Sequence, residues 1–206
     1  ADTARTIAIH SLRGGTGCST LSVNLGISLA SLWGRTILLD MTMTAGQVAL
    51  MLNMNLRRTW ADIARFKEGE FDMDALHSVI SVHESGLAFI AAPTFPAEGA
   101  ALRSETLLTA LDLLKHRYDY ILADLPHDFN DTALQVLDSA DMILMVATPD
   151  MASVRATAAA MDTYSKLGYP KEKIKLVINA TFPRSGLPKD KIETALGLTS
   201  IVTIPH

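Results

Sequence analysis

The chain has 206 residues, of which 49% are apolar and 19% are charged, and its formal net charge is −4. This composition predicts a globular domain with a sizeable core, and the single cysteine, Cys18, excludes a disulfide framework. Six scattered histidines give no zinc signature, and the acidic balance disfavours nonspecific DNA binding, which depends on lysines and arginines that neutralise phosphates. We expect a soluble, cytoplasmic protein, because the sequence has neither a signal peptide nor eighteen consecutive apolar residues.

Short apolar runs alternate with longer helical patterns along the whole chain. Strands are expected at 6–12, 36–40, 87–92, 120–124, 142–147, 175–179 and 200–204, and helices at 19–33, 104–117, 131–139, 151–167 and 189–196. Several short helices are expected within 46–83, and Pro93, Pro96 and Gly99 predict a loop after the third strand. The alternation is typical of repeated βαβ units. It predicts an α/β fold of three layers, with a mostly parallel central sheet flanked by helices, as one domain over 1–206.

A glycine-rich turn between the first strand and the first helix has the context of a phosphate-binding loop. The glycines at 14, 15 and 17 allow backbone N–H groups to turn around an anion, and the helix adds its positive N-terminal end. Ser19 occupies the position of the hydroxyl that binds Mg²⁺, and Thr20 is expected near the α-phosphate. A purely structural glycine turn is the alternative. The loop predicts a bound nucleotide with Mg²⁺ and a fold of the P-loop NTPase type.

Cys18 stands where such a loop usually has a lysine that bridges the β- and γ-phosphates. The loss of this lysine is expected to weaken nucleotide binding by roughly ten- to a hundredfold and to slow hydrolysis by a larger factor. A thiol at a helix N-terminus often has a lowered pKa, so redox sensing is one hypothesis for Cys18. The other is that a small residue fills the place of the lysine.

The loop, 13–20 in this sequence, resembles that of the MinD/ParA group of deviant Walker A ATPases. Arg13 falls where that group has a signature lysine that reaches the partner's phosphates across a nucleotide-sandwich dimer. Asp40 matches the first carboxylate of the group's switch I, but Thr42 replaces the second, which helps to organise the attacking water. The resemblance implies a homodimer with degenerate catalytic residues, in which Arg13 is the one candidate for a trans-acting phosphate contact.

The resemblance extends to the later strands. Asp124 and Pro126 are similar to the group's Walker B and switch II residues, which implies that Asp124, with Ser19 and Asp40, belongs to the Mg²⁺ site. Asn179 falls where the group recognises adenine, and Pro205 is similar to the start of its base-flanking loop. The resemblance therefore implies ATP or ADP with Mg²⁺ as the cofactors, and the loop residues 14–20, with Asn179 and Pro205, as the nucleotide-binding residues.

Further segments resemble the CpaE/TadZ branch, which localises the Tad/Flp pilus assembly machinery to a cell pole. They lie at 46–50, 83–87, 91–93 and 148–150, together with Ser153 and Arg155, and the segment 184–186 adds support. The branch implies pilus-assembly proteins as partners, at most peripheral association with a membrane, and an N-terminal receiver-like domain. Because the chain does not begin with methionine, we expect it to be a fragment of a longer protein.

Three functions remain open at this point. The first is a regulatory or scaffold protein that has an ATPase fold but weak or absent hydrolysis. The second is an active ATPase with an ATP-dependent dimer cycle. The third, a DNA-segregation ATPase, is disfavoured by the acidic charge.

Two histidines and a group of methionines complete the candidates. His10, inside the first expected strand, is interpreted as a hydrogen-bonded structural residue, whereas His127 follows the Walker B-like segment and is a candidate contact of the nucleotide or of a dimer partner. Core packing is favoured over an interface for the methionines at 41, 43, 51 and 54.

Overall fold

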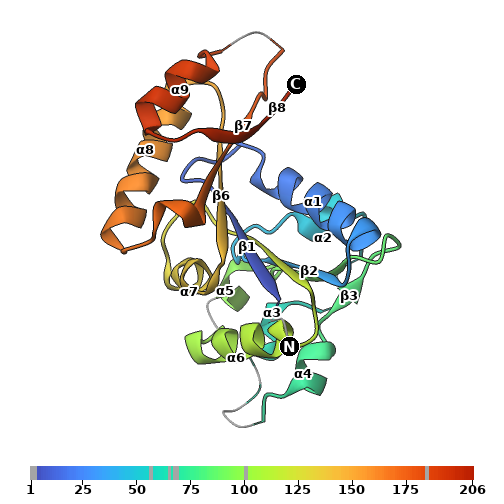
Figure 1. Ribbon diagram of the computed structural model, residues 1–206. Coiled ribbons are helices and arrows are strands. Elements are labelled where there is room, and N and C mark those ends of the chain that lie inside the picture. The colour runs from blue at the N-terminus through green and yellow to red at the C-terminus, as the bar shows by residue number, and fades with distance from the viewer. Residues whose placement is uncertain (1–3, 56–57, 65, 67–69, 100–101, 184–185) are drawn as a thin grey trace.

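The computed structural model describes residues 4–55, 58–64, 66, 70–99, 102–183 and 186–206 (Figure 1). The strands are β1 (Arg5–His10), β2 (Thr36–Asp40), β3 (Ser81–Val82), β4 (Ala88–Ile90), β5 (Tyr120–Asp124), β6 (Met142–Ala147), β7 (Ile174–Asn179) and β8 (Ser200–Ile204). The helices are α1 (Cys18–Leu32), α2 (Val48–Met51), α3 (Trp60–Ile63), α4 (Met73–His77), α5 (Pro96–Gly99), α6 (Ser104–Lys115), α7 (Asp131–Ser139), α8 (Met151–Lys166) and α9 (Lys189–Leu196), with a 3₁₀ turn at Lys171–Lys173.

The strands form one sheet in the order β3-β4-β2-β5-β1-β6-β7-β8. All neighbouring pairs are parallel except β3 with β4, so the predicted mostly parallel sheet is confirmed. In a parallel sheet the carboxyl ends of β1, β2, β5, β6 and β7 meet at one edge, where open α/β folds bind their ligands. The fold therefore gathers the loops that follow these strands.

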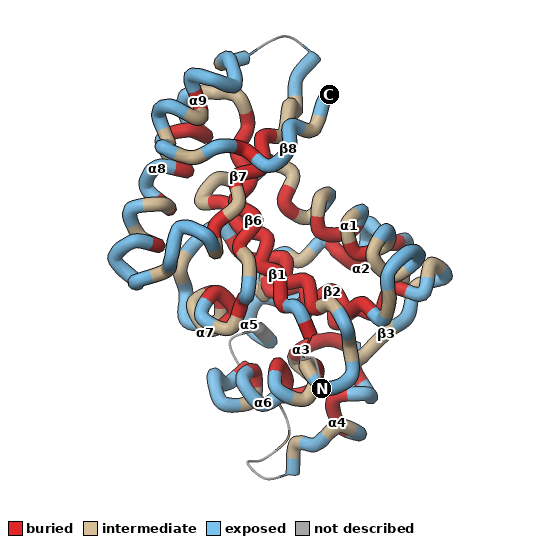
Figure 2. Tube along the Cα trace, in the orientation of Figure 1, coloured by how far each residue is buried: buried red, intermediate tan, exposed pale blue. Residues whose placement is uncertain are grey.

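Helices cover both faces of the sheet (Figure 1), and the strand residues alternate between two cores. Ile7 and Ile9 of β1 belong to one core cluster together with Val23 of α1 and Val48 of α2. Ala8, which points the opposite way, belongs to the second cluster, to which α6, α7 and α8 contribute. Figure 2 shows the buried residues concentrated along the central strands. Burial on both faces explains why these strands read as continuous apolar runs in the sequence.

Several expected boundaries differ from those in the structure. The first strand ends at His10, not at residue 12, because the chain turns there into the glycine-rich loop. The third expected strand is the shorter β4, and the two-residue β3, which pairs with it in the antiparallel sense, was not predicted. The loop expected after this strand contains the four-residue α5, which begins at Pro96 because proline fits the first turn of a helix. Elements this short leave no periodic pattern in a sequence.

The segment 46–83 contains three short helices, as predicted, in α2, α3 and α4. The side chain of Thr59 caps α3, and Trp60 at the first position of this helix is completely buried. The indole N–H of Trp60 donates a hydrogen bond to the carbonyl oxygen of Asp40 at 3.0 Å. This bond fixes the end of β2. In the described part of the chain, no helix is long and apolar enough to cross a membrane.

Candidate functional site

The glycine-rich loop connects β1 to α1, as the sequence predicted. Gly15 and Gly17 have φ angles of 79° and 94°, a region that side chains other than glycine rarely adopt. A Cβ atom at Gly17 would lie 2.4 Å from the side-chain nitrogen of Asn179, so a larger residue would also collide there. The first turn of α1 carries no acidic residue, and its N–H groups and positive end are therefore suited to an anion.

A cavity of about 570 Å³ opens over this loop at the carboxyl edge of the sheet. The loop and α1 contribute Gly15, Gly17, Cys18, Ser19 and Thr20. The other lining residues are Gln47, Met51, His127, Asn179 and Thr181. The cavity thus joins most of the predicted phosphate-binding residues with Asn179, the predicted base-binding residue. Gly14 and Thr16 belong to the loop but do not line this cavity, and the Thr16 hydroxyl donates instead to the Arg13 carbonyl at 3.3 Å.

Ser19 and Asp124 lie together beside the cavity. The Ser19 hydroxyl donates a hydrogen bond of 2.6 Å to one carboxylate oxygen of Asp124, and the Ser22 hydroxyl donates one of 3.2 Å to the other. Burial raises the pKa of Asp124, and the two hydrogen bonds partly offset this effect. Hydroxyl and carboxylate oxygens are the hard donors that Mg²⁺ prefers. Among the described residues, no group of three or more His, Cys, Asp and Glu side chains could hold a metal.

Asp40 ends β2 next to Asp124, but its carboxylate is turned into its own loop. It accepts hydrogen bonds from the backbone N–H of Thr42 at 3.2 Å and of Val48 at 3.1 Å. A Cβ atom at Gly46 would lie only 2.4 Å from a carboxylate oxygen of Asp40, so the loop backbone packs closely against this group. Burial, and then the charge of Asp124, raise the pKa of Asp40 to about 7. Its role as a Mg²⁺ ligand stays a prediction, since both of its carboxylate oxygens accept hydrogen bonds within its own loop.

Cys18 is only 3% exposed and packs in the core cluster that contains Ile9 and Val23. Burial raises the pKa of its thiol to about 12. The Thr16 hydroxyl, 3.5 Å from the sulfur, lowers the pKa by a smaller amount. The expectation of a lowered pKa is therefore wrong, and redox sensing loses its physical basis, because reactivity depends on the thiolate. Cys18 is a neutral, buried residue in the position of the lysine.

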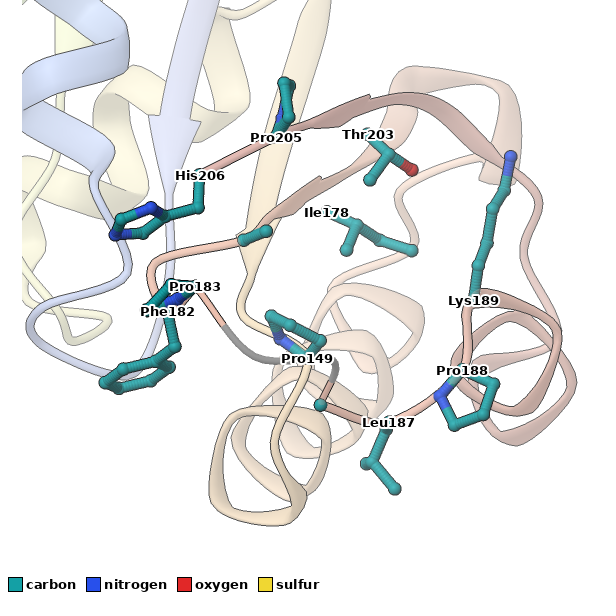
Figure 3. A pocket seen from close by; sticks show the side chains of 12 residues that line it. Pro149, Ile178, Phe182, Pro183, Leu187, Pro188, Lys189, Thr203, Pro205 and His206 are labelled. Atoms are coloured by element: carbon teal, nitrogen blue, oxygen red, sulfur yellow. The ribbon is translucent and has the colours of Figure 1, made fainter.

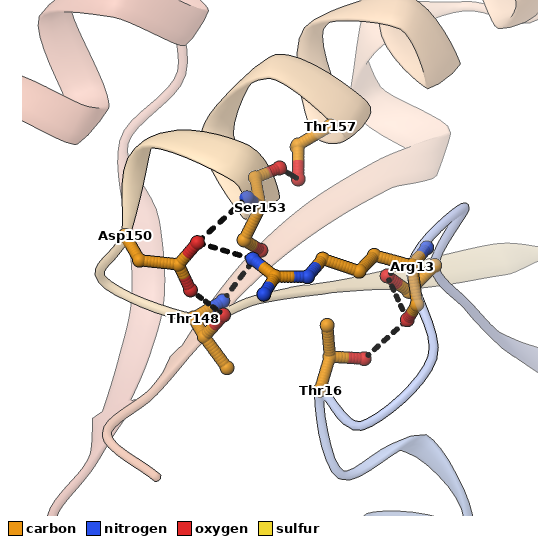
Figure 4. Close-up of polar contacts among 7 residues, drawn as sticks. Arg13, Thr16, Thr148, Asp150, Ser153 and Thr157 are labelled. Carbon is orange, nitrogen blue, oxygen red and sulfur yellow. Dashed lines mark hydrogen bonds and ion pairs between the residues drawn. The ribbon is translucent and has the colours of Figure 1, made fainter. Parts of the chain in front are cut away.

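Arg13 is held within its own chain (Figure 4). Its guanidinium forms an ion pair with Asp150, the residue that caps the N-terminus of α8. Asp150 also accepts hydrogen bonds from the Thr148 hydroxyl at 2.6 Å and from the backbone N–H of Ser153 at 3.0 Å. Partial burial opposes the ionisation of Asp150, but these hydrogen bonds and Arg13 outweigh it and lower the pKa of the carboxyl. In this chain Arg13 thus has a charge partner of its own.

Asn179 and Pro205, the two predicted base-binding residues, line different cavities. The side-chain N–H of Asn179 donates to the carbonyl oxygen of Thr16 at 2.8 Å, which ties the end of β7 to the phosphate loop. Pro205 lines a second, mainly apolar cavity of about 600 Å³ that is closed by the loops before α8 and α9, together with Ile178 and Phe182 (Figure 3). A shared contact of Asn179 and Pro205 with one base stays a prediction.

The two histidines differ in their environment. His10 is completely buried between Tyr164 of α8, which contacts its Nδ1, and the carbonyl oxygen of Asp128, which lies 2.9 Å from its Nε2. Burial lowers the pKa of His10 to about 4, so it is a structural residue, as interpreted from the sequence. His127 lines the cavity, and its Nδ1 lies 2.8 Å from the carbonyl oxygen of Ser11.

Sequence reasoning missed several residues of the site. Asp150 belongs to the segment 148–150 noted in the sequence, but its ion pair with Arg13, 137 positions away, was not predicted. Met51, expected in the core, is 46% exposed and lines the cavity with Gln47, whereas Met41 is completely buried as expected. Nothing in the sequence pattern separates these two methionines, because the short α2 decides which of them faces the loop.

A model of the protein family described as cellulose biosynthesis protein BcsQ matches residues 4–190. Among curated proteins, the chain is 26% identical over 181 residues to a putative septum site-determining protein MinD of Guillardia theta. That match includes 88% of this chain and 65% of the relative, so the chain spans somewhat less than two thirds of its length.

Two solved structures share the fold. A septum site-determining protein MinD from Pyrococcus horikoshii, complexed with Mg-ADP, superposes with a TM-score of 0.83 at 21% identity, covering 98% of this chain and 81% of that one. A ParA family ATPase from Chlorobium tepidum superposes with a TM-score of 0.87 at 20% identity, covering 100% and 85%. The relatives and structures together identify a P-loop ATPase fold of the MinD/ParA type.

Proposed function

We propose, on the premise that this chain belongs to the family described as cellulose biosynthesis protein BcsQ, that it is a nucleotide-binding regulatory or scaffold protein whose ATP hydrolysis is weak or absent. One observation carries the proposal. The phosphate loop has its glycines, its helix and its Ser19–Asp124 pair, but a buried, neutral Cys18 stands where a cation is needed. Phosphate binding through backbone N–H groups survives such a change, whereas stabilisation of charge that develops during hydrolysis does not.

The proposed ligand is ATP or ADP with Mg²⁺ in the cavity over the phosphate loop. The Ser19 hydroxyl and the Asp124 carboxylate, which lie 2.6 Å apart, would hold the metal. Bound Mg²⁺ would neutralise phosphate charge. The loop N–H groups would bind the phosphate oxygens, and Asn179, whose side chain lies beside the loop, would contact the base. The solved MinD structure with Mg-ADP supports this choice of ligand by its shared fold.

The ion pair of Arg13 is a second argument for the proposal that hydrolysis is weak. A phosphate contact across a dimer would require the Arg13 guanidinium to leave its ion pair with Asp150, in which the two side chains are 39% and 31% exposed. Thr42, in place of a second carboxylate in the loop after β2, offers only a hydroxyl to an attacking water. The proposed protein therefore binds nucleotide as a stable ligand, and not as a substrate that it turns over rapidly.

Two similarities suggest different cellular processes for this chain. The family description names cellulose biosynthesis, whereas the resemblance to the CpaE/TadZ branch suggests Tad/Flp pilus assembly. In both settings we assign the chain the same role, which is to recruit assembly proteins as a cytoplasmic homodimer. In the pilus case this homodimer would lie at a cell pole. It would not bind DNA. Contact with a membrane would be peripheral at most, and the domain would be part of a longer protein with an N-terminal receiver-like domain.

An active ATPase with an ATP-dependent dimer cycle is the second candidate. The intact Ser19–Asp124 pair and the similarity to MinD proteins favour it. In this case the missing positive charge would come from Arg13 after release from Asp150, or from a partner.

Calorimetry with Mg-ATP and a turnover assay distinguish the two candidates. The natural chain is expected to bind Mg-ATP with little turnover, and Cys18→Lys is expected to bind roughly ten- to a hundredfold more tightly. Ser28→Lys, which adds the same charge to an exposed position of α1, is the matched control and should leave the affinity unchanged. Turnover by the natural chain at a rate similar to that of MinD proteins, abolished by Asp124→Ala, would establish the second candidate. Absence of Mg-ATP binding by both the natural chain and Cys18→Lys would refute both.

A further inference from the structure

Nucleotide in the cavity over the phosphate loop would need a positive charge beside its phosphates. The two loop positions that could supply this charge, 13 and 18, do not. Cys18 is neutral and buried, and the Arg13 guanidinium is engaged by Asp150. Of the ten described residues that line the cavity, His127 has the one side chain that can become a cation. It lies three positions after Asp124, the last residue of β5.

The ring of His127 has a fixed orientation. A carbonyl oxygen only accepts hydrogen bonds, so the 2.8 Å contact with the Ser11 carbonyl requires that Nδ1 carries a proton and donates it. In the part of the chain that the structure describes, the other nitrogen, Nε2, has no hydrogen-bond partner, and it lies near the loop. A Cβ atom built on Gly14 would be 3.8 Å from Nε2 and 3.6 Å from Cδ2. Because glycine has no side chain, the ring edge reaches the backbone of the loop.

This orientation makes the ring a switchable anion ligand. When Nε2 is unprotonated, its lone pair repels a phosphate oxygen. When Nε2 is protonated, the ring carries a full positive charge and donates a hydrogen bond from Nε2 without breaking the bond to Ser11. A charge-assisted hydrogen bond to a phosphate oxygen is the contribution that the absent lysine would otherwise make.

The charged and titratable groups around His127 permit this role. Asp124 of β5 attracts the protonated ring, while His10 of β1, with its pKa lowered to about 4, stays neutral and does not compete. From α1 the cavity receives the neutral Cys18. From α2 it receives Gln47 and Met51, which carry no charge at any pH. The carboxylate of the adjacent Asp128 accepts the backbone N–H of Asn130 at 3.1 Å.

We propose that His127 is the phosphate-binding cation of this site and takes over the electrostatic role of the absent lysine, with Nδ1 fixed on Ser11 and Nε2 donating to a phosphate oxygen of the nucleotide. The inference rests on the proposed function, because it assumes that the cavity binds nucleotide. It adds that binding takes up a proton, so that affinity rises as the pH falls.

The test is calorimetry of the natural chain and of His127→Gln with Mg-ATP between pH 6 and pH 8. The terminal phosphate of ATP titrates in the same range, so the difference between the two proteins is the quantity that matters. His127→Gln keeps an N–H donor for Ser11 but cannot become charged, and it is expected to bind about tenfold more weakly at pH 6 and to lose most of the difference at pH 8. His127→Lys should bind tightly across the range. His116→Gln, an exposed histidine at the end of α6, is the matched control.

A second measurement uses the natural chain alone and does not depend on how the variants fold. The ring ¹⁵N signals of His127 report its protonation in an NMR spectrum, and on addition of Mg-ATP at pH 7 they should move toward those of an imidazolium. Equal affinity and equal pH dependence of the natural chain and His127→Gln, or ring signals that do not move on binding, would overturn this inference and leave the proposed function intact. No binding of Mg-ATP by the natural chain at any of these pH values would overturn both.

Discussion

Asp40 makes the stability of this domain depend on pH in a way that one substitution should remove. Burial and the neighbouring Asp124 raise the pKa of Asp40 from its ordinary value of 3.8 to about 7. The folded protein therefore holds a proton on Asp40 that the unfolded chain releases above about pH 4. The stability from this proton is complete below pH 3.8 and is lost progressively as the pH rises to 7.

The magnitude follows from the two pKa values. From pH 5 to its pKa of about 7, Asp40 in the folded protein holds about one proton more than in the unfolded chain. This span of about two pH units, at about 1.36 kcal/mol per unit, costs the folded state roughly 2–3 kcal/mol by pH 8. For a domain of this size a loss of 1 kcal/mol lowers Tm by about 2–4 °C, so the contribution of Asp40 is a fall in Tm of roughly 5–10 °C.

Asp40→Asn should abolish this contribution, because an amide does not ionise. Its oxygen still accepts a backbone N–H, whereas its NH₂ group lacks the acceptor that it needs in this loop, so the variant loses some stability at every pH. The change in Tm between pH 5 and pH 8, and not Tm itself, is the decisive quantity. It is measured by circular dichroism with EDTA present, with Asp112→Asn on the exposed side of α6 as the control. If Asp40→Asn loses as much Tm between pH 5 and pH 8 as the natural chain, the account of Asp40 is wrong.

Three further outcomes are expected. Cys18 should resist alkylation at pH 8 in the folded protein and react fully in urea, whereas rapid labelling of the folded protein would contradict its burial and raised pKa. Gly17→Ala should destabilise the domain by about 2 kcal/mol or more, measured by urea unfolding, and prevent Mg-ATP binding. Gly168 also has a positive φ, but a Cβ atom there would meet no other atom, so Gly168→Ala should cost only about 1 kcal/mol and leave binding unchanged. Asp150→Asn keeps a good cap for α8 but removes the ion pair of Arg13, and urea unfolding should show a loss of less than about 1 kcal/mol because the pair is partly exposed; a loss above 3 kcal/mol would mean that the pair is far more strongly coupled than its exposure indicates.

The phosphate loop shows how far local sequence reaches. A strand, a glycine-rich turn and a helix within about 30 residues predict a backbone conformation, because glycines alone allow the positive φ angles at Gly15 and Gly17. The same reasoning placed Ser19 at the start of the helix and Asp124 at the end of a buried strand, and the structure brings the two side chains into contact. Their roles in binding nucleotide and Mg²⁺ remain predictions, as does that of Asn179.

Asp40 and Pro205 show where this reasoning ends. The position of Asp40 at the end of β2 was predicted, but the direction of its carboxylate depends on how the loop 42–48 folds back over it. Pro205 lies at the end of β8 as expected, yet the packing of the loops before α8 and α9 places it in a separate cavity from Asn179.

The sequence by itself determined the α/β fold, the parallel sheet and the chemistry of the phosphate loop, including the absence of a lysine at Cys18. These properties depend on the order of apolar runs and on residues a few positions apart, which restrict the backbone locally. Only the tertiary structure decided that the Cys18 thiol is buried and has a raised pKa, that Arg13 is paired with Asp150 and that the Nε2 of His127 lies near the loop. Those properties arise from contacts between segments more than a hundred positions apart. The energies of such contacts depend on burial and geometry, which appear only when the helices and the sheet pack together.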